Sequence, residues 1–214
     1  MSLYTPAHFA TGNRVAIARL MHDHAFATLV TPGAPEPMVS HLPLQFVPGC
    51  EPHGTLIGHF ARANPHWEAA AATPSVAIFH GPHAYISPNW YTQPDRMVPT
   101  WNYAAVHAHG TLEIIEDLTE ARHVLETLVH RFEHDRAKPW TFDMPPRQRD
   151  AMVGAIVAFR MRIKRLDAKF KLSQNRTAED RGRVVAGLRN DGYPEALHTA
   201  TWMEIYTDAK KDAP

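Results

Sequence analysis

Cysteine, net charge and long apolar runs are all scarce in this chain. Cys50 is the only cysteine among 214 residues, so no disulfide and no cysteine-based zinc site can form within the chain. Lys plus Arg and Asp plus Glu both number 22, a balance that argues against a strongly cationic binder of polyanions. No run approaches the roughly 18 apolar residues of a membrane span, and the N-terminus lacks the pattern of a signal peptide. We expect a cytoplasmic protein.

Several catalytic and nucleotide-binding motifs are also missing. Neither G-x-G-x-x-G after a strand nor G-x-x-x-x-G-K-[ST] occurs, which argues against a doubly wound α/β fold. G-x-S-x-G and S-x-x-K are absent, so hydrolase chemistry has little support. The 15 histidines include no H-E-x-x-H, and we predict no bound metal. Cys50 is a weak candidate for a nucleophile, because its acidic neighbour Glu51 disfavours the reactive thiolate form.

Many short elements separated by prolines are what the chain does have. Its 18 prolines and its alternating apolar segments favour an antiparallel sheet or small barrel with peripheral helices, in the α+β class. Strands are predicted over residues 26–30, 38–46, 55–60, 76–79, 85–87, 103–116 and 155–166. Helices are predicted to begin near residues 13, 65, 117, 177 and 194, and loops are expected at 88–99 and 134–146.

The segment from Gly58 to Pro65 is the first candidate site. A strand delivers Arg62 to the start of a helix, where Asn64 is the expected cap and Pro65 the first helical residue. Free N–H groups at a helix start and the planar guanidinium group both suit a phosphate. The alternative is a capped surface helix with a solvated arginine, which spacing alone favours.

Two further segments combine polar and aromatic side chains. Residues 169–176 bring together two lysines, a serine, two amides and an arginine, which suit a flat heteroaromatic ligand with polar edges. Residues 81–91 and 98–103 alternate aromatic and hydrogen-bonding side chains, a lining typical of sites for flat ligands. A solvated strand face is the alternative for the first segment. Packing of a loop or a dimer interface is the alternative for the second.

Taken together, these motifs resemble the PaiB-type family of FMN-binding transcriptional regulators. Six blocks occur in the family's order: Tyr4-Thr5-Pro6-x-His8-Phe9, His41-Leu42-Pro43, Gly58-His59-x-Ala61-Arg62-x-Asn64-Pro65, Gly81-Pro82-His83-Ala84-Tyr85-Ile86-Ser87-Pro88-x-Trp90-Tyr91, Val98-Pro99-Thr100-Trp101-Asn102-Tyr103 and Lys169-x-Lys171-Leu172-Ser173-Gln174-Asn175-Arg176. The resemblance implies a single split β-barrel domain over residues 1–214, related to pyridoxamine-phosphate oxidase. Residues 1–166 would form the antiparallel barrel with inserted helices, and residues 167–214 would carry the last motif and a helical tail. It also implies a homodimer with FMN at the subunit interface.

The resemblance also implies which residues contact the cofactor. Arg62 and Asn64 fall where related split barrels hold the flavin phosphate, and His59 is a further candidate, with a structural histidine as its alternative. The ring system and ribityl chain would be contacted by Trp101, Asn102, Tyr103, Lys171, Ser173, Gln174 and Asn175. Two positions depart from the family. Ala168 replaces a common glycine and would be strained if its φ were positive, and the loop over residues 92–97 is short and lacks a lysine.

Three functions follow from this interpretation. Family regulators repress degradative-enzyme and sporulation genes, but the sequence contains no clear helix-turn-helix, and only the basic segment Arg160–Arg176 could contact DNA. The alternative is a flavin-dependent oxidoreductase, in which the flavin does the redox chemistry. A third interpretation is a split-barrel dimer that no longer binds flavin, supported only by Ala168 and the short loop.

Overall fold

A computed structural model describes residues 3–49 and 53–208, and the predicted nucleophile candidate Cys50 lies outside this part. The strands are β1 (Phe26–Thr31), β2 (Met38–Pro43), β3 (Gln45–Val47), β4 (Thr55–Ala61), β5 (Ser75–Ile86), β6 (Thr100–Gly110), β7 (Leu112–Ile114), β8 (Ile156–Arg162) and β9 (Arg165–Lys171). The α-helices are α1 (Arg14–Asp23), α2 (His66–Ala72), α3 (Leu118–Glu133), α4 (Pro146–Gly154), α5 (Ala178–Asp191) and α6 (Pro194–Asp208). Three 3₁₀ turns are η1 (Ala7–Phe9), η2 (Pro88–Trp90) and η3 (Pro94–Arg96).

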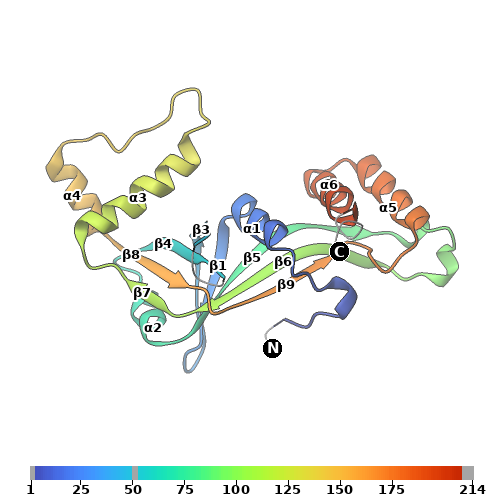
Figure 1. Ribbon diagram of the computed structural model, residues 1–214, viewed down its shortest axis with the longest axis horizontal. Coiled ribbons are helices and arrows are strands. Elements are labelled where there is room, and N and C mark those ends of the chain that lie inside the picture. Colours follow the sequence, from blue (N-terminus) through green and yellow to red (C-terminus); the bar gives the residue numbers. More distant parts are fainter. Residues whose placement is uncertain (1–2, 50–52, 209–214) are drawn as a thin grey trace. The chain divides into compact units, whose positions relative to one another are not determined.

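Two sheets organise the chain (Figure 1). The strand order is β2-β1-β5-β6-β9 in the first and β3-β4-β8-β7 in the second. Phe26 pairs with Pro43 in the hairpin of β1 and β2, and Gly58 pairs with Phe159 between β4 and β8, which lie far apart in sequence; both pairings are antiparallel. Pro43 ends the edge strand β2, as expected of a residue that has no N–H to donate. The predicted antiparallel α+β class is confirmed.

The chain divides into two compact units, each built from separated segments. Unit 1 comprises residues 3–23, 80–106 and 167–208, and unit 2 comprises residues 24–79 and 107–166. In unit 2, α3 and α4 bury Val124, Leu128 and Val153 in one apolar cluster with Ile115 and Ala158. In unit 1, α5 packs against α6 (Figure 1). Arg189 of α5 forms an ion pair with Glu204 of α6 at 2.6 Å.

Local capping signals correctly located two of the helices. Asp117 caps α3 by accepting a hydrogen bond from the Glu120 N–H at 2.8 Å, and Thr177 caps α5 by accepting one from the Asp180 N–H at 3.1 Å. Each hydrogen bond satisfies a backbone donor that would otherwise be unpaired in the first turn. The predicted helix starts at residues 117 and 177 therefore agree with the structure to within one residue.

Several predicted strands have wrong boundaries. The predicted strand 38–46 is divided into β2 and β3, which belong to different sheets. The segments 76–79 and 85–87 are one strand, β5, because Gly81 allows close packing: a Cβ there would lie 3.0 Å from the Ala104 carbonyl oxygen. The predicted strand 103–116 breaks after Gly110 into β6 and β7. The predicted strand 155–166 is in fact β8 followed by the start of β9. The sequence did not reveal the turn at Ile163 and Lys164, because the alternation continues through it without a Gly or Pro. Helix α4 was not predicted; it begins at Pro146, the last residue of the predicted loop 134–146.

Candidate functional site

In unit 1, the amides and the serine of the last motif shape the turn after β9. Asn102 donates to Ser173 Oγ at 2.9 Å and also contacts Met203 of α6, and both Asn102 and Ser173 are buried. Ser173 has φ of 64°, the only positive φ of a non-glycine residue in the described chain. The amide oxygen of Gln174 accepts from the Leu172 N–H at 2.7 Å, and its nitrogen donates to the Phe170 carbonyl at 2.5 Å. Asn102, Ser173 and Gln174 therefore hold the backbone in place, while Asn175 is exposed.

The opposite face of the same strands in unit 1 is aromatic and open. Strand alternation turns Trp101 and Tyr103 away from Asn102. Trp101 is 52% exposed, and its ring lies 6.1 Å from that of Tyr85 and 6.3 Å from that of His83, both on β5. We name this surface, made by His83, Tyr85, Trp101, Tyr103 and the lysines of β9, the aromatic face. Such a surface suits a flat ring that stacks on aromatic side chains.

Two lysines of β9 border the aromatic face. Lys169 is 7% exposed, donates to the Tyr4 carbonyl at 2.9 Å, and lies 5.2 Å from the centroid of the Tyr103 ring. Lys171 donates to Thr100 Oγ1 at 2.6 Å and to the Trp101 carbonyl at 2.5 Å. Burial, and then repulsion from Lys169 and Arg176, lower the pKa of Lys171 below its usual value. The sequence placed Lys169 in the motif but not among the cofactor contacts.

In unit 2, Arg62 joins the end of β4 to the chain around α4 and β8. Its Nε donates to the Gly154 carbonyl at 2.6 Å, and its Nη2 donates to the Ile156 carbonyl at 2.7 Å. A guanidinium group has five N–H donors, so the outer edge of this exposed side chain retains donors for an anion. Helix α2 begins at His66, one residue later than predicted, and Asn64 caps it by accepting from the His66 N–H at 3.0 Å.

A chain of buried polar side chains in unit 2 continues from Asn64. Asn64 donates to Ser40 Oγ at 3.0 Å, and Ser40 bonds to His66 Nδ1 at 2.8 Å. His66 Nε2 bonds to Thr31 Oγ1 at 2.8 Å, and Thr31 bonds to Ser75 Oγ at 2.7 Å. Because these residues come from β1, β2, α2 and β5, no local signal in the sequence could have identified the chain. It ties the Arg62–Asn64 turn to the core of unit 2.

His59, another predicted contact, has a buried nitrogen without a partner. It lies on β4, and its Nδ1 makes no hydrogen bond within the described part of the chain. Such an orphaned polar atom is costly unless a ligand or water supplies a partner. Burial lowers the pKa of His59, as it does for His66. The neutral imidazole is therefore the favoured form of both side chains.

These two histidines predict a loss of stability in acid. The pKa of each is lowered in the folded state, so at pH values below about 6.5 the unfolded chain binds more protons. Their contribution to stability is complete above that pH and is lost progressively as the pH falls toward the folded-state pKa. We expect a lower urea midpoint at pH 5.5 than at pH 7.5. A His59→Gln/His66→Gln double variant should show a flatter dependence, and an unchanged dependence would contradict this assignment.

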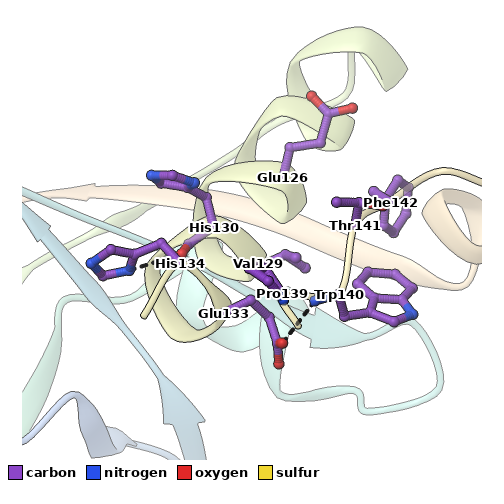
Figure 2. A pocket seen from close by; sticks show the side chains of 9 residues that line it. All are labelled: Glu126, Val129, His130, Glu133, His134, Pro139, Trp140, Thr141 and Phe142. Carbon is purple, nitrogen blue, oxygen red and sulfur yellow. Dashed lines mark hydrogen bonds between the residues drawn. The ribbon is translucent and has the colours of Figure 1, made fainter. Parts of the chain in front are cut away.

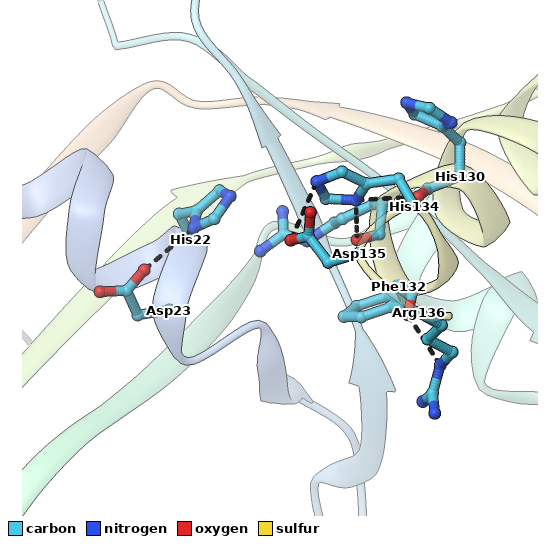
Figure 3. Close-up of polar contacts among 8 residues, drawn as sticks. His22, Asp23, His130, Phe132, His134, Asp135 and Arg136 are labelled. Atoms are coloured by element: carbon cyan, nitrogen blue, oxygen red, sulfur yellow. Dashed lines mark hydrogen bonds and ion pairs between the residues drawn. The ribbon is translucent and has the colours of Figure 1, made fainter. Parts of the chain in front are cut away.

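A cavity of about 190 Å³ in unit 2 lies between the end of α3 and residues 139–142 (Figure 2). Its edge is fixed by Glu133, whose carboxylate accepts from the Trp140 N–H at 2.9 Å and pairs with Arg136. His134 stacks on His130 and contacts Asp135 at 3.1 Å (Figure 3). The cavity is smaller than the roughly 300–1,000 Å³ of ordinary ligand sites and is therefore too small for a flavin. The described residues contain no group of three potential metal ligands, and no described helix is long and apolar enough to span a membrane.

Residues 3–165 match the family described as "Putative FMN-binding domain". The chain belongs to this FMN-binding family. It is 35% identical over 204 residues to the Bacillus subtilis protein named "Protease synthase and sporulation protein PAI 2", covering 94% of this chain and 97% of that protein. The predicted PaiB-type family and its cofactor, FMN, are thereby confirmed.

Two solved structures share the fold of this FMN-binding chain. The FAD and heme binding protein of Mycobacterium smegmatis has a TM-score of 0.61 and 17% identity, over 83% of this chain and 79% of that one. The flavocytochrome Anf3 of Azotobacter vinelandii has a TM-score of 0.59 and 13% identity, over 81% and 75%. At such identities the likeness shows the fold alone. The predicted fold, an antiparallel α+β fold of the split-barrel type, is confirmed.

The side chains of this FMN-binding chain fit a flavin mononucleotide by their chemistry. Unit 1 offers exposed aromatic rings beside ammonium groups, and unit 2 offers the outer guanidinium edge of Arg62 and the orphaned Nδ1 of His59. The strain expected at Ala168 is not found, because Ala168 lies within β9 and the positive φ is at Ser173 instead. The short loop is held in place, since Thr92 donates twice to Asp180, at 2.9 and 3.0 Å.

Proposed function

We propose that this chain is an FMN-binding negative transcriptional regulator that works as a homodimer. The observation that carries the proposal is the aromatic face, where exposed rings and ammonium groups share one side of the strands of unit 1. The regulatory role is supported by the likeness to a protein named for protease synthase and sporulation. FMN supplies reversible electron transfer when it is bound.

The proposed cofactor contacts fall into three groups. Trp101, Tyr103 and Lys171 present rings and a cation toward the open side, which suits the isoalloxazine and its polar edge. Asn102, Ser173 and Gln174 position that face through the turn after β9, with exposed Asn175 available to the ribityl chain. Arg62, Asn64 and His59 are the proposed phosphate contacts.

The first experiment is an absorbance spectrum of the purified protein, repeated on the supernatant after heat denaturation. A flavin spectrum that passes into the supernatant is expected for a non-covalent cofactor. A colourless protein that also fails to take up added FMN would contradict the proposal and favour the interpretation of a split barrel that has lost its flavin.

Arg62→Ala is expected to weaken FMN binding about 10- to 150-fold, the equivalent of about 1.5–3 kcal/mol for a lost charge-assisted contact. Riboflavin, which lacks the phosphate, should lose much less affinity. Flavin fluorescence titrations measure both. Arg147→Ala is the matched control, because Arg147 is an exposed arginine of α4 in the same unit. Equal losses for FMN and riboflavin would mean that Arg62 acts only through its carbonyl partners.

The proposed dimer follows from the apolar groups that unit 1 leaves open. Tyr85, Val98 and Trp101 are 41%, 70% and 52% exposed, and exposed aromatic groups on one surface are typical of interfaces. Light scattering after size exclusion is expected to give about twice the chain mass of 24.1 kDa. A monomer at all concentrations, with and without FMN, would contradict this part of the proposal.

The regulatory proposal includes direct contact with DNA through the segment Arg160–Arg176. Part of its charge is already compensated, since Arg160 pairs with Glu120 and Glu113, and Arg162 lies 3.7 Å from Glu113. A gel shift with the promoter region of its own gene should show binding that weakens as salt rises. If no shift appears at physiological salt, regulation would have to be indirect.

The alternative function is an FMN-dependent oxidoreductase, either a flavin reductase or an oxidase of a small substrate. It is favoured by the exposure of Trp101, because an open ring surface leaves room for a second planar reactant. Anaerobic mixing with NADH or NADPH is expected to bleach the flavin in this case. Unbleached flavin with both donors would exclude the reductase version.

A further inference from the structure

Lys169 is an unusual residue because it is a buried cation. Its side chain is 7% exposed, whereas lysines are almost never buried unless they are paired. Its neighbours are the Tyr4 carbonyl at 2.9 Å, the Tyr4 ring at 5.4 Å and the Tyr103 ring at 5.2 Å. All of these contacts are neutral, so they solvate the charge without compensating it.

Lys171 places a second positive charge on the same face of β9 as Lys169. Residues two apart on a strand point to the same side, and repulsion from Lys169 contributes to the lowered pKa of Lys171. Its ammonium group contacts Thr100 Oγ1 and the Trp101 carbonyl, and it lies 5.8 Å from the Phe9 ring. These contacts too are neutral. Arg176 adds a third positive charge to the electrostatic surroundings of Lys171.

No carboxylate forms an ion pair with either lysine in the part of the chain that the structure describes. Asp167, the nearest acidic residue along β9, has interactions of its own. Each ammonium group has three N–H donors. Lys169 uses one and Lys171 uses two in the contacts above, so donors remain on both groups. Two neighbouring cations that contact aromatic rings and keep unused N–H donors would be stabilised by an oxyanion, which accepts hydrogen bonds and compensates the charge.

We propose that Lys169 and Lys171 together form a seat for an oxyanion, a phosphate or carboxylate group, on the aromatic face of unit 1. The proposal rests on the flavin-binding function proposed for that face and adds an anionic ligand group to it. The test distinguishes two sources of the anion: the phosphate of FMN itself, which would then sit on the two lysines instead of on Arg62, or the acidic group of a second ligand that meets the flavin. Residues 4–9 contribute to the seat, because the Tyr4 ring lies near the Lys169 ammonium group and the Phe9 ring near that of Lys171.

Inorganic phosphate is the probe that tests the seat. The thermal midpoint of the full-length apoprotein is measured against phosphate concentration, with chloride at equal ionic strength as the reference. A ligand that binds only the folded state raises the midpoint with its concentration. We expect the wild-type midpoint to rise with phosphate. In Lys169→Met and Lys171→Met the apparent phosphate affinity should fall at least about tenfold.

Two further variants separate binding from folding. Lys138→Met removes an exposed lysine of unit 2 that lies outside every proposed binding segment, and it should keep the full response to phosphate. Lys171→Arg keeps the positive charge and should therefore keep most of the response to phosphate. If Lys169→Met does not fold, the pair Lys171→Met and Lys171→Arg decides. The proposal is overturned if the wild type responds to phosphate no more than to chloride, or if Lys171→Met responds as the wild type does.

Flavin titrations in the presence of phosphate identify the source of the anion. Competition with FMN but not with riboflavin would place the flavin phosphate on the two lysines. Phosphate binding that leaves FMN affinity unchanged would assign the seat to the acidic group of a second ligand. A protein that binds neither flavin but keeps its lysine-dependent phosphate response would contradict the proposed function and leave the oxyanion seat standing.

Discussion

His66→Ala is expected to lower the free energy of unfolding by about 3 kcal/mol. The substitution removes a buried ring, and large-to-small changes of this kind leave a cavity that costs a few kcal/mol. It also removes one hydrogen bond of 2.8 Å from each of Ser40 and Thr31, which keep their bonds to Asn64 and Ser75, and a lost hydrogen bond costs about 0.5–1.5 kcal/mol. Urea denaturation followed by circular dichroism at pH 7.5 measures the change.

His41→Ala is the matched control for this prediction. His41 lies on β2 of the same unit, is exposed, and contacts Thr28 Oγ1 at 3.2 Å. A surface substitution of this kind usually changes stability by no more than about 0.5 kcal/mol. Similar losses in the two variants would mean that the buried chain of polar side chains around His66 adds nothing to stability.

Gly187→Ala is expected to destabilise the protein by about 2 kcal/mol, although alanine is the better helix former. A Cβ at position 187 would lie 2.4 Å from the Trp90 ring, a distance that no rotation of a methyl group can relieve. Overpacking of this kind typically costs about 1–3 kcal/mol. Arg183, on the same helix as Gly187, donates to the Trp90 carbonyl at 2.8 Å and so holds the backbone that carries the ring close to α5.

Gly182→Ala in the same helix should have the opposite effect. Nothing lies within 4 Å of a Cβ at this position, so the variant gains helix propensity of about 1 kcal/mol without a clash. Thermal midpoints of the two variants should therefore move in opposite directions from the wild type. Two shifts of the same sign would show that the contact between Trp90 and α5 is looser than its geometry indicates.

Signals that act within one or two turns of the chain were enough to predict many elements. The caps Asp117 and Thr177 depend on hydrogen bonds between near neighbours, and the structure confirms them. Boundaries failed where distant packing overrides the local signal. Gly81 and Pro82 read as a turn but lie inside β5, because only a glycine fits against Ala104.

The candidate site shows the same division. Six ordered motifs predicted the family and its FMN, and the comparisons confirm both. The sequence treated Asn102, Ser173 and Gln174 as open donors, but their hydrogen bonds to one another and to the backbone depend on β6, β9 and α6 meeting. The assignment of each predicted residue to a particular part of FMN stays a prediction.

The sequence by itself determined the fold class, the family and the residue types that the site offers. Alternation, caps and motif order are properties of neighbouring residues, so they can be recognised without knowledge of tertiary contacts. The tertiary structure alone decided which of those side chains face inward. It bonded His66 to hydroxyl groups of two separate strands, β1 and β2, and left Lys169 buried without a carboxylate partner in the described chain. Burial and hydrogen-bond pairing depend on residues far apart in sequence, and these contacts form only when the chain folds.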